Sequence, residues 1–378
     1  MEKLLIKGGK SLSGDIDCSG GKNAALPIIA ASILSSNNIT LKNLPYLQDI
    51  TTMFELIGSM GADISLDERM NFRLNTSNLS NLEARYELVK TMRASILVLG
   101  SMVAKYGYAK IALPGGCAIG SRPVNYHLKA LEKLGAEISL NNGYIEAKAK
   151  KLIGADIEFD GVTVTGTANL MMAASLAEGV TTLTNVAKEP EISDLADFLN
   201  SMGAKISGAG TDEIRIEGVE ELTGTTFKIP ADRIEAGTYL VAAAITNGKI
   251  TIKKIDPTRM GSIIETLQKA GADVNLNENS ISLDMTKNAI KPVDIVTAPF
   301  PGFPTDMQAQ FTVLNCIGHG ESSVKETIFE NRFMHVQELN RMGTDITING
   351  TTALINGVDS ISGAQVMATD LRASASLI

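Results

Sequence analysis

Apolar and polar positions along the chain predict two kinds of helix that alternate with short strands. Residues 93–105 carry alanine, serine, leucine and valine with almost no charge, which predicts a helix buried on all sides. Residues 124–134 instead place apolar side chains at helical spacing, as expected of a helix that covers the outside of a core. Gly135 then supplies a left-handed cap, and the alternating segments 138–140 and 144–147 supply strands.

The end of the second helix recurs five times. In each copy a glycine ends the helix and a strand-like segment follows, and successive glycines lie about 70 residues apart. The copies span residues 59–64, 133–138, 201–206, 269–274 and 341–346. This period is longer than that of solenoid repeats and is typical of a compact supersecondary unit. We therefore predict repeated units of buried helix, strand, amphipathic helix and one or two further strands. Units one to three run from about residue 22 to 209, and units four and five from about 232 to 354.

A sixth unit begins at residues 369–377, and the sequence stops within it. By comparison with the earlier units, its closing glycine would lie beyond the last residue. A helix without its strands would leave an unpaired sheet edge and an uncovered core. We therefore expect either a truncated polypeptide or a disordered tail that is missing from the sequence.

Composition narrows the class of protein. A length of 378 residues favours two domains, and no apolar run is long enough to span a bilayer. The N-terminus lacks the features of a secretory signal, and three scattered cysteines without a CxxC pair fit a reducing cytosol. A net charge of −8 argues against a nucleic-acid or anionic-membrane partner, although a local pocket could still bind an anionic small molecule. Three widely separated histidines give no metal spacing, so we expect neither a metal nor a cofactor.

The segment 114–123 houses Cys117 in a glycine-rich loop with a proline at each end. The guanidinium of Arg122 would favour the thiolate and could also hold a phosphate or carboxylate by paired hydrogen bonds. The alternative is a small buried cysteine in a surface turn, which composition alone leaves open.

Charged residues also stand at the predicted starts of the buried helices. Lys22, Arg93 and Arg372 lie in first turns, where the helix dipole disfavours a cation by roughly 0.5 kcal/mol. Three such placements suggest an anion site, although each side chain alone could simply be solvated. In unit five the corresponding residue is Asp306, which among cations would stay ionised and could accept a proton, or could serve only as a cap. Asn23 could orient a ligand or cap its helix.

Several motifs in order resemble one family. They are Lys22-Asn23, residues 91–95, the Cys117 loop, and residues 164–167, 189–192, 303–310, 330–333 and 368–376. With them the whole sequence closely resembles the UDP-N-acetylglucosamine 1-carboxyvinyltransferases. The resemblance implies the enolpyruvyl transferase fold, an α/β (α+β) architecture with two domains of three repeats each, in which sheets and outer helices surround buried helices. The first domain would span 22–229, and the second would combine 1–21 with 230–378. Ligand binding would close the cleft between the two domains.

The resemblance also implies a reaction. The enolpyruvyl group of phosphoenolpyruvate would be transferred to the 3-hydroxyl of UDP-N-acetylglucosamine by addition and elimination, with release of phosphate. This would be the first committed step toward peptidoglycan, in the cytoplasm. The implied catalytic residues are Cys117, Asp306, Lys22 and Arg93. Cys117 would protonate the methylene carbon and be the thiol that fosfomycin alkylates, and Asp306 would be the base for the sugar hydroxyl.

Binding roles follow from the same resemblance. Lys22, Arg93 and Arg122 would hold the phosphate and carboxylate of phosphoenolpyruvate, and Asn23 would help to fix the intermediate. The segments that match the nucleotide-sugar site contain Arg122, Pro123, Val124, Thr165, Gly166 and Ile328. Asp370 and Arg372 would support closure.

The sequence departs from the family at two points. Asn125 stands where aspartate is frequent, which affects the expected nucleotide contacts more than the reaction. A final segment with another active-site arginine is absent, so a polypeptide that ends at Ile378 is expected to show little turnover. Two alternatives remain: a shikimate-pathway enolpyruvyl transferase, which does not depend on a loop thiol, and a catalytically weak paralogue that binds UDP-sugar as a regulator.

Overall fold

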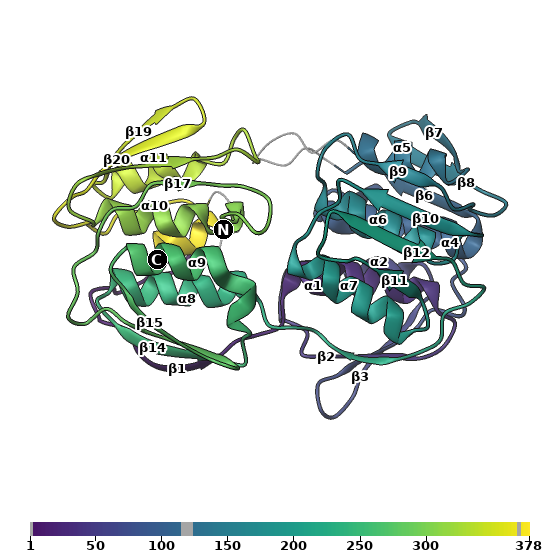
Figure 1. The fold of residues 1–378 in the computed structure, drawn as a ribbon, viewed down its shortest axis with the longest axis horizontal. Coiled ribbons are helices and arrows are strands. Elements are labelled where there is room, and N and C mark those ends of the chain that lie inside the picture. The colour runs from purple at the N-terminus through teal and green to yellow at the C-terminus, as the bar shows by residue number, and fades with distance from the viewer. Residues whose placement is uncertain (1–2, 115–123, 369–371) are drawn as a thin grey trace. The chain divides into compact units, whose positions relative to one another are not determined.

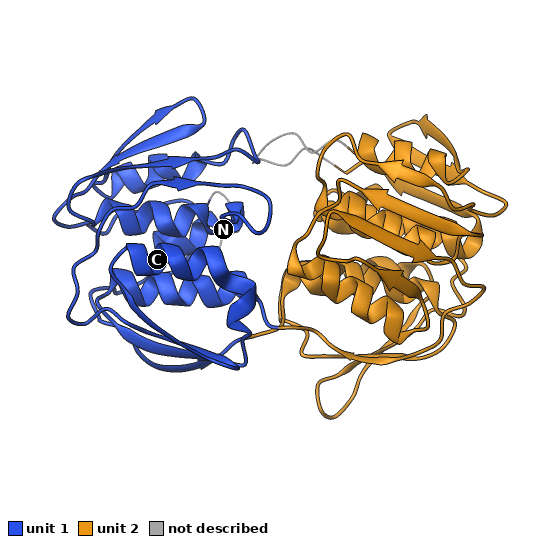
Figure 2. Cartoon of the chain, viewed as in Figure 1, with its two compact units in different colours: residues 1–18, 117–121, 231–378 blue, residues 19–116, 122–230 orange. Residues whose placement is uncertain are grey.

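The computed structural model describes residues 3–114, 124–368 and 372–378. These residues form two compact units, called unit 1 and unit 2 below (Figure 2). These two names refer to the compact units and not to the repeated units of the sequence. Unit 1 combines the N-terminal segment up to Cys18 with the chain from Ala231 onward, and unit 2 holds the described residues between them.

Within the described residues, the strands form five four-stranded sheets of one topology. In each sheet one edge strand runs parallel to its neighbour, and the other two strand pairings are antiparallel. The sheets of unit 2 are β13 (Thr226–Lys228), β2 (Ile39–Lys42), β4 (Phe72–Asn75) and β3 (Asp63–Leu66); β5 (Glu83–Ala84), β6 (Tyr108–Ala112), β8 (Tyr144–Lys148) and β7 (Glu137–Asn141); and β9 (Asp156–Glu158), β10 (Val180–Thr184), β12 (Glu213–Glu217) and β11 (Lys205–Ser207). Those of unit 1 are β1 (Ser13–Asp17), β14 (Lys249–Lys253), β16 (Ser280–Asp284) and β15 (Asp273–Asn277); and β17 (Ile295–Val296), β18 (Glu321–Lys325), β20 (Thr352–Asn356) and β19 (Asp345–Asn349).

The parallel edge strand of a sheet can come from far away in the sequence. β13, at the end of unit 2, pairs with β2 near its start, so the three repeats of this unit close on themselves. β1, near the N-terminus, pairs with β14, and this pairing ties the N-terminal segment to unit 1.

Buried helices form the centre of unit 2. They are α1 (Lys22–Ala31, extended by η1, Ser32–Leu34), α4 (Val98–Tyr106, preceded by η2, Arg93–Leu97) and α6 (Val164–Ala174). Their inner residues are alanine, leucine, isoleucine and methionine with little or no exposure, which confirms the predicted all-round burial. The outer helices α2 (Gln48–Ser59), α5 (Asn125–Lys133) and α7 (Pro190–Ser201) bury one face each, and α3 (Tyr86–Val89) is a single turn.

Unit 1 repeats this plan with α8 (Arg233–Ile245) and α10 (Gln308–Cys316, preceded by η4, Thr305–Met307) as buried helices. Figure 1 shows both between the sheet that holds β14 and the sheet that holds β20. The outer helices are α9 (Gly261–Lys269, after η3, Pro257–Met260) and α11 (Met334–Arg341). A final turn, η5 (Ala373–Leu377), packs against α10 and α11.

The helix-ending glycines take the conformation that the repeat predicts. Their φ angles are positive, between 91° and 109°. Residues with a Cβ rarely adopt this region, so each glycine ends its helix and turns the chain into the next strand. The repeated helix–glycine–strand unit is therefore confirmed in all five copies.

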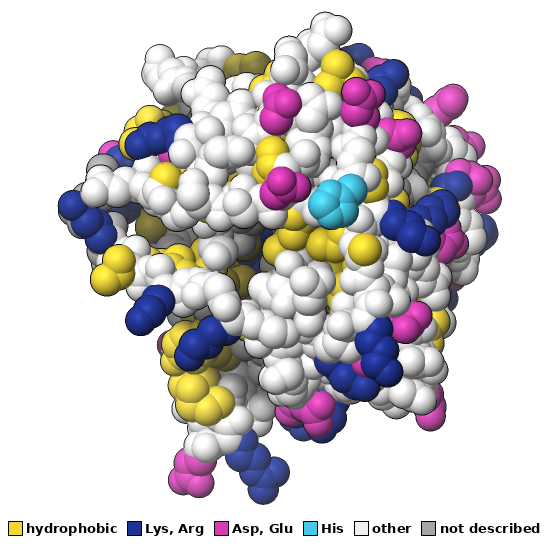
Figure 3. All heavy atoms as spheres, turned by 90° about the vertical axis from the view of Figure 1, so that its left-hand side faces the viewer, with side chains coloured by type: hydrophobic (Ala, Val, Ile, Leu, Met, Phe, Trp, Pro, Cys, Tyr) yellow, Lys and Arg dark blue, Asp and Glu magenta, His cyan; other side chains and the backbone are white. Residues whose placement is uncertain are grey.

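The face that Figure 3 shows has no large area in which all charged side chains have the same sign. Basic and acidic side chains are interspersed there. No helix in the described part of the chain is long and apolar enough to cross a membrane.

Candidate active site

Asp306 lies at the start of a buried helix, within η4, and two guanidinium groups approach its carboxylate. Arg332 donates from Nη2 to Asp306 Oδ1 at 2.7 Å, and Nε of Arg372 lies 3.8 Å from Oδ2. The Arg332 side chain is 6% exposed, so this pair is little screened by solvent. Both cations favour the ionised carboxylate, which is the form that could accept a proton.

The Arg332–Asp306 pair is connected to a series of buried hydrogen bonds. Nη1 of Arg332 donates to Thr305 Oγ1 at 2.7 Å, and the Thr305 hydroxyl donates to Oε2 of Glu326 at 2.8 Å. Glu326 is 2% exposed. Its Oε1 accepts from the hydroxyl of Thr297 and the N–H of Ile328, each at 2.8 Å. The buried charges of Glu326 and Arg332 are thus connected through one hydroxyl, which offsets part of the cost of removing both from water.

Arg372 joins a third carboxylate to the same site. Its Nη2 lies 3.7 Å from Asp232 Oδ2. Asp232 is the N-cap of α8, where its Oδ1 accepts from the N–H groups of Ile234 and Glu235 at 2.8 and 3.2 Å. The start of α8, the start of η5 and the Asp306 turn therefore meet within unit 1.

In unit 2 the first residue of α1 is already paired. Lys22 Nζ donates to Asp49 Oδ2 at 2.8 Å, from a side chain that is mostly buried. Asp49 lies in the first turn of α2, where a carboxylate is favoured by the helix dipole. This pair fixes the ammonium at the N-terminus of the buried helix, and Asn23 follows it at an exposed position.

A second buried network lies beside Arg93, the first residue of η2. Asn169, inside α6, accepts from Gly100 N–H and donates from Nδ2 to Ile96 O at 2.8 Å and to Nδ1 of His127 at 3.0 Å. Because Nδ1 accepts, Nε2 of His127 carries the proton and donates to Thr165 Oγ1 at 3.2 Å. Burial, with the Arg93 charge as a second cause, lowers the pKa of His127 to about 4.

Two other predicted residues, Val124 and Gly166, lie at the starts of helices. Val124 is the N-cap of α5, and Gly166 donates its N–H to the Thr163 side chain that caps α6. Cys117, Arg122, Pro123 and Asp370 lie outside the described residues. The convergence of Lys22, Arg93 and Arg122 on one anion stays a prediction.

Two further cysteines are unsuited to nucleophilic chemistry. Cys18 and Cys316 are buried free thiols. Desolvation raises the pKa of each to about 12, so both stay protonated near neutral pH.

Three residues that the sequence analysis did not single out belong to these networks: Glu326, Arg332 and His127. Arg332 lies within the 330–333 motif, so its position in a family motif was the available signal. Glu326 follows a strand and reads as an ordinary surface charge. Its burial comes from contacts with Thr297 and Thr305, which are 29 and 21 residues away in the chain.

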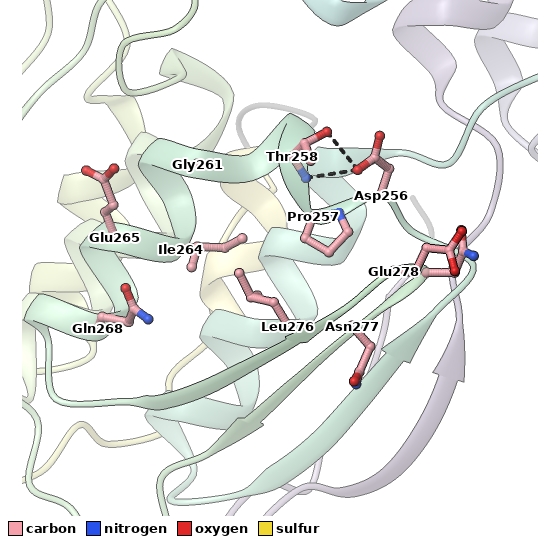
Figure 4. Close-up of a pocket in the computed structure, with 11 residues that line it drawn as sticks. Asp256, Pro257, Thr258, Gly261, Ile264, Glu265, Gln268, Leu276, Asn277 and Glu278 are labelled. Atoms are coloured by element: carbon pink, nitrogen blue, oxygen red, sulfur yellow. Dashed lines mark hydrogen bonds between the residues drawn. The ribbon is translucent and has the colours of Figure 1, made fainter.

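A large open cavity lies elsewhere in unit 1. Figure 4 shows Asp256, Ile264, Glu265, Leu276 and Glu278 around it, between α9 and the turn that joins β15 to β16. Its volume is about 840 Å³. None of the predicted site residues lines it. Among the described residues, no group of three or more histidine, cysteine, aspartate or glutamate side chains could hold a metal ion.

Comparison with known proteins defines the class. A family model described as EPSP synthase (3-phosphoshikimate 1-carboxyvinyltransferase) matches residues 6–378. The enolpyruvyl transferase NikO from Streptomyces tendae has a similar structure, with a TM-score of 0.87 at 22% identity, over 98% of this chain and 88% of that chain. An EPSP synthase from Acinetobacter baumannii gives a TM-score of 0.74 at 18% identity, over 98% and 89%. The enolpyruvyl transferase fold is thereby confirmed.

Relatives of higher identity narrow the class. A UDP-N-acetylglucosamine 1-carboxyvinyltransferase from Hydrogenovibrio crunogenus is 57% identical over 378 residues, covering all of this chain and 90% of that protein. One from Coxiella burnetii is 55% identical over 379 residues, covering 87% of that protein. The chain therefore belongs to the EPSP synthase family of enolpyruvyl transferases and, within it, to the UDP-N-acetylglucosamine 1-carboxyvinyltransferases. The resemblance predicted from the motifs is confirmed.

Proposed function

We propose that this enzyme transfers the enolpyruvyl group of phosphoenolpyruvate to the 3-hydroxyl of UDP-N-acetylglucosamine and releases phosphate, as the first committed step of peptidoglycan synthesis. The observation that carries the proposal is the full-length identity of 55–57% to transferases of that name. Asp306 supports it, because its carboxylate lies beside two guanidiniums at a helix start.

The proposed chemistry has two steps. Asp306 accepts the proton of the sugar 3-hydroxyl while that oxygen attacks the central carbon of phosphoenolpyruvate, and Cys117 gives a proton to the methylene carbon. The product of this addition is a tetrahedral ketal that still carries the phosphate. Loss of a proton from the new methyl group then restores the double bond as phosphate leaves.

Binding roles are proposed on the same basis. The negative charges of phosphoenolpyruvate would be held by Lys22, Arg93 and Arg122. Lys22 is already paired with Asp49, so the phosphate must either share Lys22 with Asp49 or displace Asp49 from it. Asn23 would help to fix the ketal. The nucleotide sugar would contact the segments that contain Arg122, Pro123, Val124, Thr165, Gly166 and Ile328.

The Thr165 contact has a specific basis in the described structure. His127 donates a hydrogen bond to Thr165 Oγ1, so the hydroxyl proton of Thr165 can point away from His127 toward a phosphate oxygen. Thr165 also lies in the first turn of α6, where the helix dipole favours an anion.

Domain movement completes the proposal. The domains would be residues 22–229 and residues 1–21 with 230–378, and ligand binding would close the cleft between them. Asp370 and Arg372 would support the closed state. The scattered cysteines fit a reducing cytoplasm, and Cys117 would be the thiol that fosfomycin alkylates.

Phosphate release with each candidate acceptor tests the proposal. We expect release from phosphoenolpyruvate that requires UDP-N-acetylglucosamine and is absent with shikimate 3-phosphate. The opposite preference would favour the shikimate-pathway alternative. Binding of UDP-N-acetylglucosamine without release from either acceptor would favour the regulatory alternative. The 55–57% identical relatives favour neither alternative.

A further inference from the structure

Four of the five described sheets close in the same way just beyond their parallel strand pair. The residue after the edge strand donates its N–H to the last carbonyl of the neighbouring strand. These bonds are Ile229 to Lys42 at 2.9 Å, Phe159 to Thr184 at 3.2 Å, Cys18 to Lys253 at 3.0 Å and Thr297 to Lys325 at 2.9 Å. The residues that follow the accepting strand are Asn43, Asn185, Lys254 and Glu326, which occupy the same place in their sheets, although only the first three have a positive φ.

In unit 2 this position serves only the local turn. Asn43 and Asn185 have φ angles of 61° and 53°, a region that asparagine tolerates well. Each donates its side-chain amide to the carbonyl across the strand pair, at Ile229 (2.9 Å) and Phe159 (2.8 Å). A neutral amide is thus sufficient for the closure.

Glu326 puts a buried negative charge at this position. Its two oxygens accept four hydrogen bonds: from the hydroxyls of Thr297 and Thr305 and from the N–H groups of Ile328 and Phe329. Burying a carboxylate costs free energy that an asparagine at the same position would avoid. Asn43 and Asn185 fill the same place without a charge, whereas the charge of Glu326 is hydrogen-bonded to Thr305.

The Thr305 contact leads to Asp306. The Thr305 hydroxyl donates to Glu326, so its lone pairs face Arg332 Nη1, and the other arm of the guanidinium reaches Asp306. A guanidinium is a rigid planar fork, so fixing one arm orients the other. The N–H bonds to residues 328 and 329 also fix the segment that leads to Arg332, whose guanidinium lies 5.3 Å from the Phe329 ring centre.

We propose that Glu326 is a positioning residue that orients Arg332 through Thr305 and thereby holds Asp306 in its reactive geometry. The inference rests on the proposed function, in which Asp306 is the base. Glu326 itself need not touch either substrate.

Four single variants and the double variant Glu326→Gln/Thr305→Val test it. Glu326→Gln keeps the shape but gives Thr305 a donor in place of one acceptor. Thr305→Val removes the linking hydroxyl, and Thr305→Ser restores it. Asn185→Gly is the matched control, because it removes the equivalent turn contact in unit 2 without backbone strain.

We expect Glu326→Gln and Thr305→Val each to lower kcat about tenfold or more, with KM for UDP-N-acetylglucosamine within about twofold of wild type. Thr305→Ser should stay within about threefold of wild type, and Asn185→Gly should lower Tm while leaving kcat unchanged. The double variant should be at most about twofold slower than the slower of its two single variants, because both substitutions act on the same connection.

Additive losses in the double variant, a Thr305→Ser as slow as Thr305→Val, or a Glu326→Gln with unchanged kcat would overturn the inference. A crystal structure of Glu326→Gln gives a readout that does not depend on turnover. We expect the Arg332 arm to leave Asp306, and a retained contact near 2.7 Å would contradict the inference. An inactive wild-type protein would instead reject the proposed function, while this structural result still decides the positioning role.

Discussion

Arg332 Nη2 lies 2.7 Å from Asp306 Oδ1, and the two residues are 26 positions apart in the chain. The carboxylate proposed as the base is therefore held on one side by a buried cation. The second carboxylate oxygen lies 3.8 Å from Arg372 Nε. A hydroxyl that Asp306 deprotonates must approach a carboxylate whose orientation is already set.

Asp306→Asn tests the base directly. The variant keeps the side-chain size but cannot accept the proton. Loss of a general base typically costs a factor of about 10² to 10⁴ in rate, so we expect a fall in kcat of that order. Calorimetric affinity for UDP-N-acetylglucosamine should change much less. Equal losses in kcat and affinity would make Asp306 a binding residue.

Arg332→Lys tests the forked contact. An ammonium is a point charge and cannot donate to Asp306 and Thr305 in the same fixed geometry. We expect a lower kcat, and a loss of unfolding free energy of about 1–3 kcal/mol because Thr305 and Glu326 lose a buried partner. Kinetics and urea unfolding measure the two effects. A fully active and equally stable lysine variant would show that the fork is dispensable.

The cysteines give a labelling prediction. Burial raises the pKa of Cys18 and Cys316 to about 12, so neither presents a thiolate at pH 8. We expect fosfomycin to add one mass increment to the native protein, and Cys117→Ala to abolish it. Peptide mapping that finds the label on Cys18 or Cys316 would contradict this assignment.

His127 predicts a pH dependence of stability. Burial, with a contribution from Arg93, lowers its pKa from 6.5 to about 4, so the unfolded chain binds a proton there that the folded protein does not. Stability from this group is fully present above about pH 6.5 and is lost as the pH falls toward 4. The loss should reach about 3 kcal/mol. Urea unfolding of wild type and His127→Gln at pH 7 and pH 4.5 measures it, and equal pH slopes would rule it out.

Gly100 tests the packing of the buried helices. A Cβ there would lie 2.3 Å from both the backbone oxygen and the side-chain Oδ1 of Asn169, so α4 and α6 would have to separate. We expect Gly100→Ala to cost about 2–4 kcal/mol. Gly261→Ala, at the start of α9 with nothing within 4 Å, is the control and should be neutral or slightly stabilising. Equal Tm values for both variants would contradict this packing.

Local sequence signals predicted the repeat well. The glycines at 61, 135, 203, 271 and 343 end their helices in the left-handed region because residues with a Cβ rarely adopt it. The nearly uncharged run at 93–105 became η2 and most of α4, since a helix with few polar side chains must be covered on all sides. Both signals lie within a few residues of the structure that they predict.

The site was less predictable, because its contacts join distant segments. The sequence predicts Asp306 and Arg372 at helix starts, but nothing in it indicates that Arg332 lies between Asp306 and Glu326. Glu326 is buried only because Thr297 and Thr305 converge on it from other elements. The three histidines only lacked metal spacing in the sequence, and the tautomer of His127 depends on Asn169, which is 42 residues away. Such pairings follow from the tertiary fold rather than from local spacing.

The most direct test of the central claim is the structure of the reaction product. The enzyme is incubated with UDP-N-acetylglucosamine and phosphoenolpyruvate labelled with ¹³C at its central carbon, and the product is analysed by NMR. We expect an ether that links the labelled vinyl carbon to oxygen 3 of the sugar, formed in equal amount with free phosphate. Pyruvate and phosphate without a sugar ether, or an ether at another hydroxyl, would contradict it.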